Sequence, residues 1–143
     1  MILRETNMDL FQSDSDAYLA HCISSDFAMG AGIAKEFTKR GVKNELQLNY
    51  IHQWNGKGYA LYTSIPSFKG CFNLVTKQSY NMKPTYTTVR QALTDMKNQI
   101  PDGSKLCMPC IASGLDRLSW EQVKTIILTV FKDKDIQITI CYH

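Results

Sequence analysis

The chain has 143 residues, of which 44% are hydrophobic and 20% are charged. This size and composition are typical of one globular domain with a core of its own, and they argue against a second domain. Sixteen basic and 13 acidic side chains leave a net charge of +3, which neither demands a nucleic-acid partner nor excludes an anionic small ligand.

Six segments have the apolar patterns of β-strands. In chain order they are residues 1–6, 17–23, 59–65, 71–77, 105–109 and 135–142. The last is the most regular, because Ile136, Ile138 and Ile140 alternate with polar or small residues. We therefore expect a sheet of six strands.

Helical spacing of apolar residues predicts four helices between these strands. They cover residues 33–40, 42–50, 85–100 and 119–131. Gly41 is the expected stop of the first helix, and Pro101 closes the third. Ser119 and Gln122 predict a capping box at the start of the fourth. The basic residues of the first two helices are expected on a solvated face: Lys35, Lys39, Arg40 and Lys43.

Strands that alternate with helices predict an α/β domain, in which a parallel or mixed sheet is covered on both faces. Ligands of such domains bind at the carboxyl ends of the strands. The N-terminal residues contain Arg4 and Glu5 and do not form a secretion signal, and no segment is long enough to span a membrane. We expect no membrane association.

Five cysteines, an odd number, argue against a disulfide framework and favour a cytosolic or nuclear location. Cys107 and Cys110 form a CxxC pair, but no second pair with metal-ligand spacing follows. We interpret these two as small residues on a strand and at its exit, and we expect neither a metal nor a cofactor.

Three loops follow strands and carry candidate chemistry. The first contains Gly30 and Gly32 before a helix, where amide groups can hold a phosphate or the glycines can simply make a turn. In the second, Ser113 and Gly114 can wrap an anion with backbone amides. The third begins at Lys77, which is either a surface lysine or, in a desolvated cleft, a nucleophile.

Several short motifs, in order along the chain, resemble the macrodomain family. They resemble most closely its branch of terminal ADP-ribose protein glycohydrolases, also described as O-acyl-ADP-ribose deacylases. The motifs are DLF (9–11), LAHCIS (19–24), MGAGIA (29–34), TK (76–77), KPTY (83–86), GLDRL (114–118) and Trp120. The resemblance implies a single macrodomain over residues 1–143, a three-layer α/β/α sandwich around a mixed six-stranded sheet.

The resemblance also implies roles for individual residues. Asp9 matches the acid that accepts a hydrogen bond from the adenine amino group, and Leu10 supplies a neighbouring backbone contact. The loop around the distal ribose and phosphates matches Ser24, Gly30, Ala31, Gly32 and Ile33. The diphosphate loop matches Ala112, Ser113, Gly114 and Leu115. Lys77 and Asp116 fall on the catalytic lysine and aspartate of the family.

The implied reaction removes ADP-ribose from an acidic side chain, with a neutral Lys77 amine as nucleophile and Asp116 as general acid and base. The family usually has Gly where this chain has Met8 and Ala112, and Cys where it has Ser113, so a tighter phosphate loop is expected. His21 also matches, and a buried structural hydrogen bond is its favoured role over a catalytic one. Arg117 is expected to pair with a carboxylate.

Three functions are left open at this stage. The first is a hydrolase of mono-ADP-ribosylated proteins, with O-acetyl-ADP-ribose and ADP-ribosylated nucleic acid as further substrates. The second is a reader module that binds ADP-ribose without turnover. The third, a nucleic-acid binder using the basic helix face, predicts a steep salt dependence. In each case the chain is expected to act as a monomer.

Overall fold

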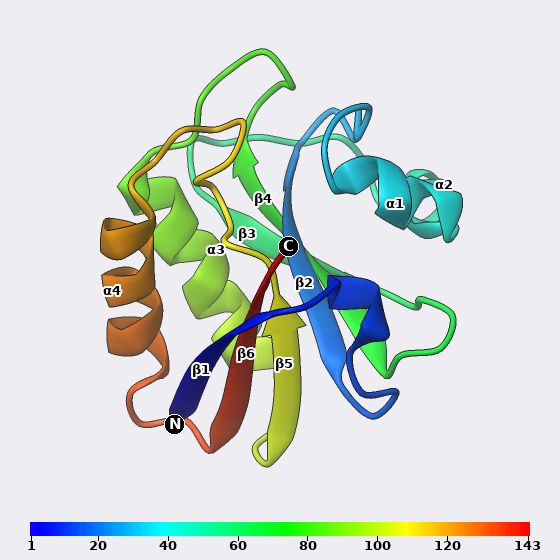
Figure 1. Ribbon diagram of the computed structural model, residues 1–143. Coiled ribbons are helices and arrows are strands. Elements are labelled where there is room, and N and C mark those ends of the chain that lie inside the picture. The colour runs from blue at the N-terminus through cyan, green and yellow to red at the C-terminus, as the bar shows by residue number, and fades with distance from the viewer.

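A mixed sheet of six strands runs through the protein between two pairs of helices (Figure 1). The computed structural model describes all residues, 1–143. The strands are β1 (Ile2–Asn7), β2 (Tyr18–Ser24), β3 (Tyr59–Thr63), β4 (Gly70–Lys77), β5 (Ser104–Met108) and β6 (Ile136–Tyr142). The helices are α1 (Ala34–Lys39), α2 (Val42–Asn49), α3 (Tyr86–Gln99) and α4 (Trp120–Phe131), with a 3-10 helix η1 (Leu10–Gln12). All predicted strands and helices are present, with ends shifted by at most two residues.

The strand order is β1-β6-β5-β2-β4-β3, and only β3 runs antiparallel to its neighbour. The other five strands are parallel, so their carboxyl ends meet at one edge of the sheet, at the top of Figure 1. The loops that follow β2, β4 and β5 leave from this edge. The predicted three-layer sandwich with a mixed sheet is therefore confirmed, and it places the three candidate loops together.

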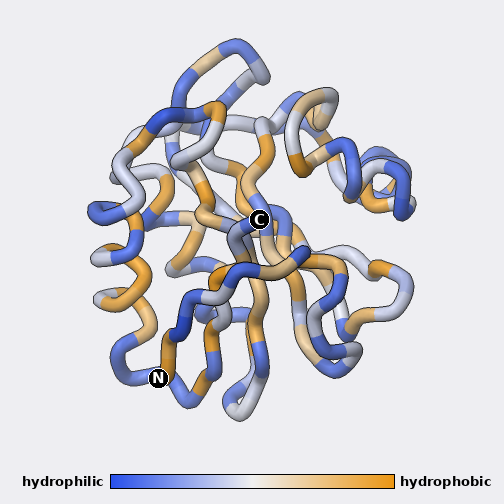
Figure 2. Tube along the Cα trace, viewed as in Figure 1, coloured by the Kyte–Doolittle hydropathy of each residue, from blue (hydrophilic) through white to orange (hydrophobic).

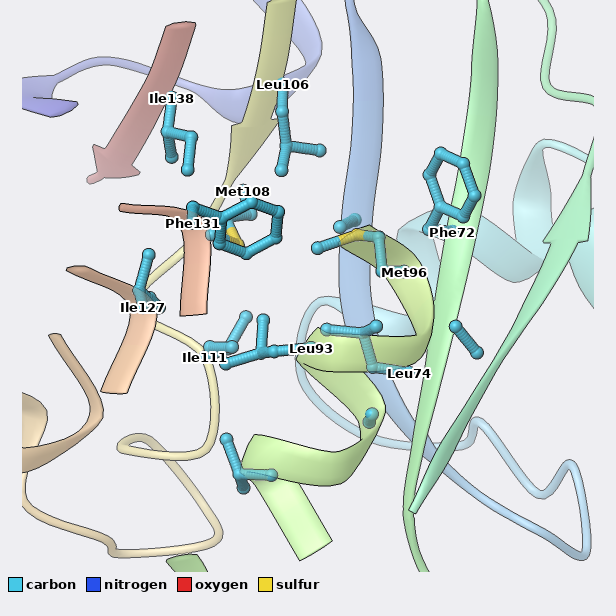
Figure 3. Close-up of a cluster of buried hydrophobic side chains, with 14 of the residues drawn as sticks. Phe72, Leu74, Leu93, Met96, Leu106, Met108, Ile111, Ile127, Phe131 and Ile138 are labelled. Atoms are coloured by element: carbon cyan, nitrogen blue, oxygen red, sulfur yellow. The ribbon is translucent and has the colours of Figure 1, made fainter. Parts of the chain in front are cut away.

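Each face of the sheet has its own core, because the central strands are buried on both sides. Tyr18 and Ala20 of β2 point into the core under α3 and α4, whereas Leu19 and Ile23 point into the core under α1 and α2. Figure 3 shows the first core, in which Met96 of α3 packs beside side chains from the strands and α4. Apolar residues accordingly concentrate in the strands and on the inner helix faces (Figure 2).

The two long helices begin in different ways. Thr85 and Thr88 cap α3 reciprocally: each hydroxyl accepts the backbone N–H of the other, at 3.0 and 3.1 Å. The predicted capping box of Ser119 and Gln122 is wrong. The backbone N–H of Ser119, which Gln122 would have bound, instead donates to the hydroxyl of Tyr86 at 2.9 Å. A tertiary contact between the two helix starts thus replaces the local cap.

His21 has the structural role expected for it. It is fully buried on β2, and its Nε2 lies 2.6 Å from Oδ1 of Asn73. The Asn73 amide nitrogen already donates to Leu61 and Thr63, so Nε2 must be the donor to Oδ1. The imidazole stacks on Phe37 of α1 at 3.7 Å. Burial lowers the pKa of His21 to about 4, so the ring is neutral and anchors α1 to the sheet.

Candidate active site

A cavity of about 770 Å³ opens at the carboxyl edge of β2, β4 and β5. This volume lies in the range of small-molecule binding sites. The loops after the three strands line it, and they contribute most of the predicted site residues. These are Ser24, Gly30, Ala31, Gly32, Ile33, Lys77, Ala112, Gly114, Leu115 and Asp116. The fold therefore brings predicted site residues that are 92 positions apart, Ser24 and Asp116, into one cavity.

Lys77 and Asp116 form an ion pair inside this cavity. Nζ of Lys77 lies 2.7 Å from Oδ1 of Asp116, and the two side chains are only 14% and 15% exposed. Lys77 is the last residue of β4, and Asp116 lies in the loop after β5. A short, charge-assisted hydrogen bond shielded from water is strong and well oriented. The pair can pass a proton between an amine and a carboxylate without rearrangement.

Cys22 of β2 also lines the cavity, close to this pair. Its burial, reinforced by the negative charge of Asp116, raises the pKa of the thiol to about 12, although Lys77 acts in the opposite direction. The thiol is therefore protonated at neutral pH and is a poor nucleophile. Among the groups at the base of the cavity, the amine of Lys77 is the stronger candidate.

The loop after β2 is held in an unusual backbone conformation. Phe27 and Met29 have positive φ values of 54° and 50°, in the left-handed region that is costly for residues other than glycine. Both backbone polar groups of Ala28, which lies between them, are hydrogen-bonded to side chains. Asp26 Oδ1 accepts its N–H at 3.1 Å, and Nζ of Lys43 donates to its carbonyl at 3.0 Å.

The role of Lys43 corrects a sequence-based expectation. The helix pattern predicts a solvated position for Lys43, but its ammonium binds the loop that precedes the predicted phosphate-binding glycines. Arg40 departs from that expectation as well, because its guanidinium lies over the ring of Phe11 at 3.8 Å. Helix periodicity could place both residues on one face, but it could not show what that face meets.

The loop after β5 is also built from strained residues. Ala112 and Arg117 have φ values of 59° and 62°, and the N–H of Leu118 donates to the Ala112 carbonyl at 2.9 Å to close the loop. Ala112 thus occupies a left-handed position, which glycine adopts more easily than alanine. Arg117 is exposed and forms no ion pair, contrary to the predicted carboxylate pairing.

Ser113 differs from its neighbours in this loop. Its hydroxyl donates to the Cys110 carbonyl at 2.8 Å, and the residue is not part of the cavity lining. The hydroxyl is therefore used within the loop. The role expected for Ser113, in which its backbone amide helps to wrap an anion, does not need the hydroxyl and stays a prediction. Gly114 and Leu115 face the cavity instead.

Asp9 and Leu10 line a second cavity of about 460 Å³. This cavity shares Ile33, Pro109 and Cys110 with the first, so the two cavities are adjacent. One carboxylate oxygen of Asp9, Oδ1, accepts the N–H of Phe11 at 3.0 Å and starts η1. The other oxygen has no hydrogen-bond partner within the protein and is free to accept from a ligand.

Residues after Lys77, in the third candidate loop, form a wall of the first cavity, although none of them is a predicted site residue. They are Tyr80, Asn81, Met82 and Lys83. Lys83 and Pro84 belong to the KPTY motif, but the other three have no motif or charge pattern that indicates a site. No cluster of three or more metal-ligating side chains occurs, and no helix has the length and apolar character needed to cross a membrane.

The chain has relatives of known activity. It is 40% identical to the bovine (Bos taurus) protein named ADP-ribose glycohydrolase OARD1 and 39% identical to the human (Homo sapiens) protein of the same name. Each match extends over 135 residues and covers 92% of this chain and 86% of the relative. No family model matches the sequence.

Solved structures share the fold at lower identity. The macrodomain of Mycobacterium tuberculosis DarG superposes with a TM-score of 0.82 at 19% identity, covering 99% of this chain and 98% of that one. The Thermus aquaticus DarG macrodomain has a TM-score of 0.80 at 16% identity, and each chain is 99% covered. Thermosipho africanus DarTG, solved in complex with ADP-ribose, has a TM-score of 0.63 at 18% identity, covering 97% of this chain and 41% of that one.

Proposed function

The chain belongs to the macrodomain family, with the ADP-ribose glycohydrolases, and we propose that it removes mono-ADP-ribose from glutamate and aspartate side chains of proteins. The observation that carries this proposal is the shielded ion pair of Lys77 and Asp116 in the cavity, 2.7 Å apart. It supplies an amine nucleophile and a proton carrier at one place.

The two adjacent cavities suit the two ends of ADP-ribose. Asp9 and Leu10 would receive the adenine at one end, with the free oxygen of Asp9 accepting its amino group. The loop 30–33 and residues 112–115 would surround the diphosphate with backbone amides, which bind anions well at such turns. Ser24 is the register partner of Lys77 across β2 and β4, so it lies near the ion pair and would contact the distal ribose.

The first chemical step replaces an ester bond with a bond to lysine. Lys77 passes a proton to Asp116 across their hydrogen bond, which leaves a neutral amine and a carboxylic acid. The amine nitrogen then bonds to the anomeric carbon, directly or through its ring-opened aldehyde, while the bond from that carbon to the ester oxygen breaks. Asp116 returns the proton to the departing carboxylate.

The second step frees the sugar. Asp116, again a carboxylate, takes a proton from a water molecule as the water oxygen bonds to the anomeric carbon. The carbon–nitrogen bond breaks, its electron pair returns to the lysine nitrogen, and Asp116 restores the proton to Lys77. The net reaction consumes one water and yields ADP-ribose and the free acid. O-acetyl-ADP-ribose and ADP-ribosylated nucleobases would enter the same cycle.

The test is release of ADP-ribose from a protein mono-ADP-ribosylated on glutamate, followed by mass spectrometry. Wild type and a Lys77→Ala variant are compared, with Lys132→Ala as the matched control because Lys132 is an exposed lysine outside the cavity. We expect release by wild type and the control, but not by Lys77→Ala. Equal release by Lys77→Ala would move the nucleophile elsewhere, and no release by wild type, with ADP-ribose still bound, would establish a reader.

The setting of the reaction is part of the proposal. Five cysteines without a disulfide pattern fit the cytosol or the nucleus, where thiols stay reduced. The substrate-binding residues all come from one chain, so a monomer suffices for the reaction. Sedimentation of the purified protein with and without ADP-ribose measures the oligomeric state.

A further inference from the structure

The connection from β4 to α3, residues 78–85, projects beyond the edge of the sheet (Figure 1). It begins at the residue after Lys77, and four of its members, residues 80–83, line the cavity. Tyr80 and Met82 are 70% and 46% exposed, and Leu115 across the opening is 68% exposed. Large apolar side chains are thus kept in solvent around the mouth of the cavity, where they add nothing to the core.

Asp26 fastens this connection to the loop after β2. Its Oδ1 accepts from the Ser24 hydroxyl at 2.5 Å and from the Ala28 N–H at 3.1 Å. Its Oδ2 accepts from the Tyr80 N–H at 3.0 Å. The two oxygens of one carboxylate therefore serve two different loops. Asp26 has a lowered pKa because these hydrogen bonds outweigh the effect of its burial, so it is ionised at neutral pH.

Lys83 fastens the other end of the connection. Its Nζ donates to the Leu115 carbonyl at 2.9 Å, next to Asp116. The ammonium forms no salt bridge with any carboxylate. Asp26 binds the backbone of Tyr80, and Lys83 binds the loop that carries Asp116. Together the two contacts hold residues 80–83 in a fixed position relative to Lys77.

We infer that residues 80–82 form the wall that receives the acceptor, the polypeptide segment to which ADP-ribose is attached, and that Asp26 and Lys83 are its positioning residues. The inference rests on the proposed function, which places the anomeric carbon beside Lys77. ADP-ribose itself extends from that point toward the glycine loop and Asp9. The acceptor must leave in another direction, and the segment that follows Lys77 is the surface it meets.

The chemistry of the wall specifies its partner. Tyr80 and Met82 offer an aromatic ring and a flexible thioether, which pack against apolar side chains with little sequence preference. Such a surface suits residues that flank a modified glutamate in a protein chain. A minimal acyl group, such as acetate, has no flanking residues that could pack against it.

The test measures binding, so that it does not depend on turnover. In a Lys77→Ala background, calorimetry compares the affinities for a glutamate-ADP-ribosylated peptide, O-acetyl-ADP-ribose and free ADP-ribose. Asp26→Asn retains one oxygen for Ser24 and Ala28 but cannot accept from Tyr80, because an amide nitrogen is a donor. Lys83→Met keeps a side chain of similar length but removes the ammonium, and with it the hydrogen bond to the Leu115 carbonyl. Asp133→Asn and Lys132→Met are matched controls at exposed positions beyond α4.

We expect Asp26→Asn, Lys83→Met and a Tyr80→Ala variant to weaken peptide binding about fivefold, which corresponds to roughly 1 kcal/mol. Their affinities for free ADP-ribose and O-acetyl-ADP-ribose should stay within about twofold of the Lys77→Ala parent. Equal losses for all three ligands, or no loss for the peptide, would overturn the inference. Wild type that binds the peptide without cleaving it would contradict the proposed hydrolysis, yet the same affinity ratios would still decide the role of the wall.

Discussion

Lys77 and Asp116 are 39 positions apart in the chain, and the fold places the ammonium of one 2.7 Å from the carboxylate of the other. Each comes from the carboxyl end of a parallel strand or from the loop after it, and both are shielded from solvent. A lysine acts as a nucleophile only after its ammonium has lost a proton, and the carboxylate of Asp116 is the nearest group that can take this proton.

This relationship predicts that Lys77→Arg is inactive. Arginine keeps the positive charge and can still pair with Asp116, but its guanidinium does not lose a proton in proteins. We expect turnover of ester-linked ADP-ribose to fall on the order of a thousandfold or more, as for loss of a nucleophile. ADP-ribose affinity by calorimetry should change little. Substantial activity in Lys77→Arg would rule out an amine nucleophile at this position.

Replacement of Asp116 should separate the two chemical steps. In Asp116→Asn no group remains to activate water, so we expect turnover to drop about a hundred- to ten-thousandfold. Those Asp116→Asn molecules that complete the first step should keep the sugar bound to Lys77, because the second step is blocked. Intact-mass measurement after borohydride reduction would detect the added ADP-ribose on Asp116→Asn but not on a Lys77→Ala, Asp116→Asn double variant. Rapid turnover by Asp116→Asn would show that another group activates the water.

Asp9 should recognise adenine by accepting a hydrogen bond from its amino group. Its free carboxylate oxygen can accept from that group, whereas the other oxygen is used by Phe11. Asp9→Ala should weaken ADP-ribose binding about tenfold, the equivalent of about 1.4 kcal/mol for a hydrogen bond to a charged group. Wild type should also prefer ADP-ribose to its inosine analogue, which lacks the amino group, and Asp9→Ala should not. If wild type and Asp9→Ala preferred ADP-ribose to the inosine analogue equally, a contact between Asp9 and the adenine amino group would be excluded.

His21 predicts a stability that declines in mild acid. Its pKa is about 4 in the folded protein because burial disfavours the charged ring, against 6.5 in an ordinary environment. The unfolded chain therefore binds the proton first, and stability that is present above pH 6.5 is lost as the pH falls toward 4. The loss approaches roughly 3 kcal/mol at the low end.

Urea unfolding at several pH values would measure this effect. His21→Gln removes the titrating ring and leaves an amide that can donate to Asn73, so its free energy of unfolding should fall less steeply between pH 6.5 and 4.5. Other groups that titrate in this range contribute equally to both proteins and cancel in the difference. Parallel pH profiles for wild type and His21→Gln would contradict the assignment.

Two glycines of the site should differ in their tolerance of alanine. Gly32 has φ of +60°, and a Cβ there would meet Leu115 at 3.3 Å. Gly114 has no left-handed φ and nothing within 4 Å of an added Cβ. We expect Gly32→Ala to lower the free energy of unfolding by about 1–2 kcal/mol and Gly114→Ala to change it by less than about 0.5 kcal/mol. Thermal or urea unfolding would measure both, and equal losses would contradict the expected strain at Gly32.

The secondary structure could be predicted from the sequence because its causes are local. The apolar spacing of residues 85–100 and the alternation of Ile136, Ile138 and Ile140 identified elements that the structure contains. The exceptions depend on distant partners. Ser119 has the residues of a capping box, but Tyr86, which is 33 positions away, takes the backbone N–H that the box would need. No local pattern contains that information.

The sequence by itself determined the alternating α/β architecture and the family. Periodicity, turn residues and the order of short motifs are local properties of the chain, so they are visible without a structure. It also indicated Lys77 and Asp116 as the residues to examine, through the motifs in which they stand. Only the tertiary structure decided that they touch and are shielded from water, since pairing of parallel strands brings their carboxyl ends together. It alone assigned Asp26, Lys43 and Lys83 to the loops they hold, because hydrogen bonds between loops depend on three-dimensional position and have no sequence period.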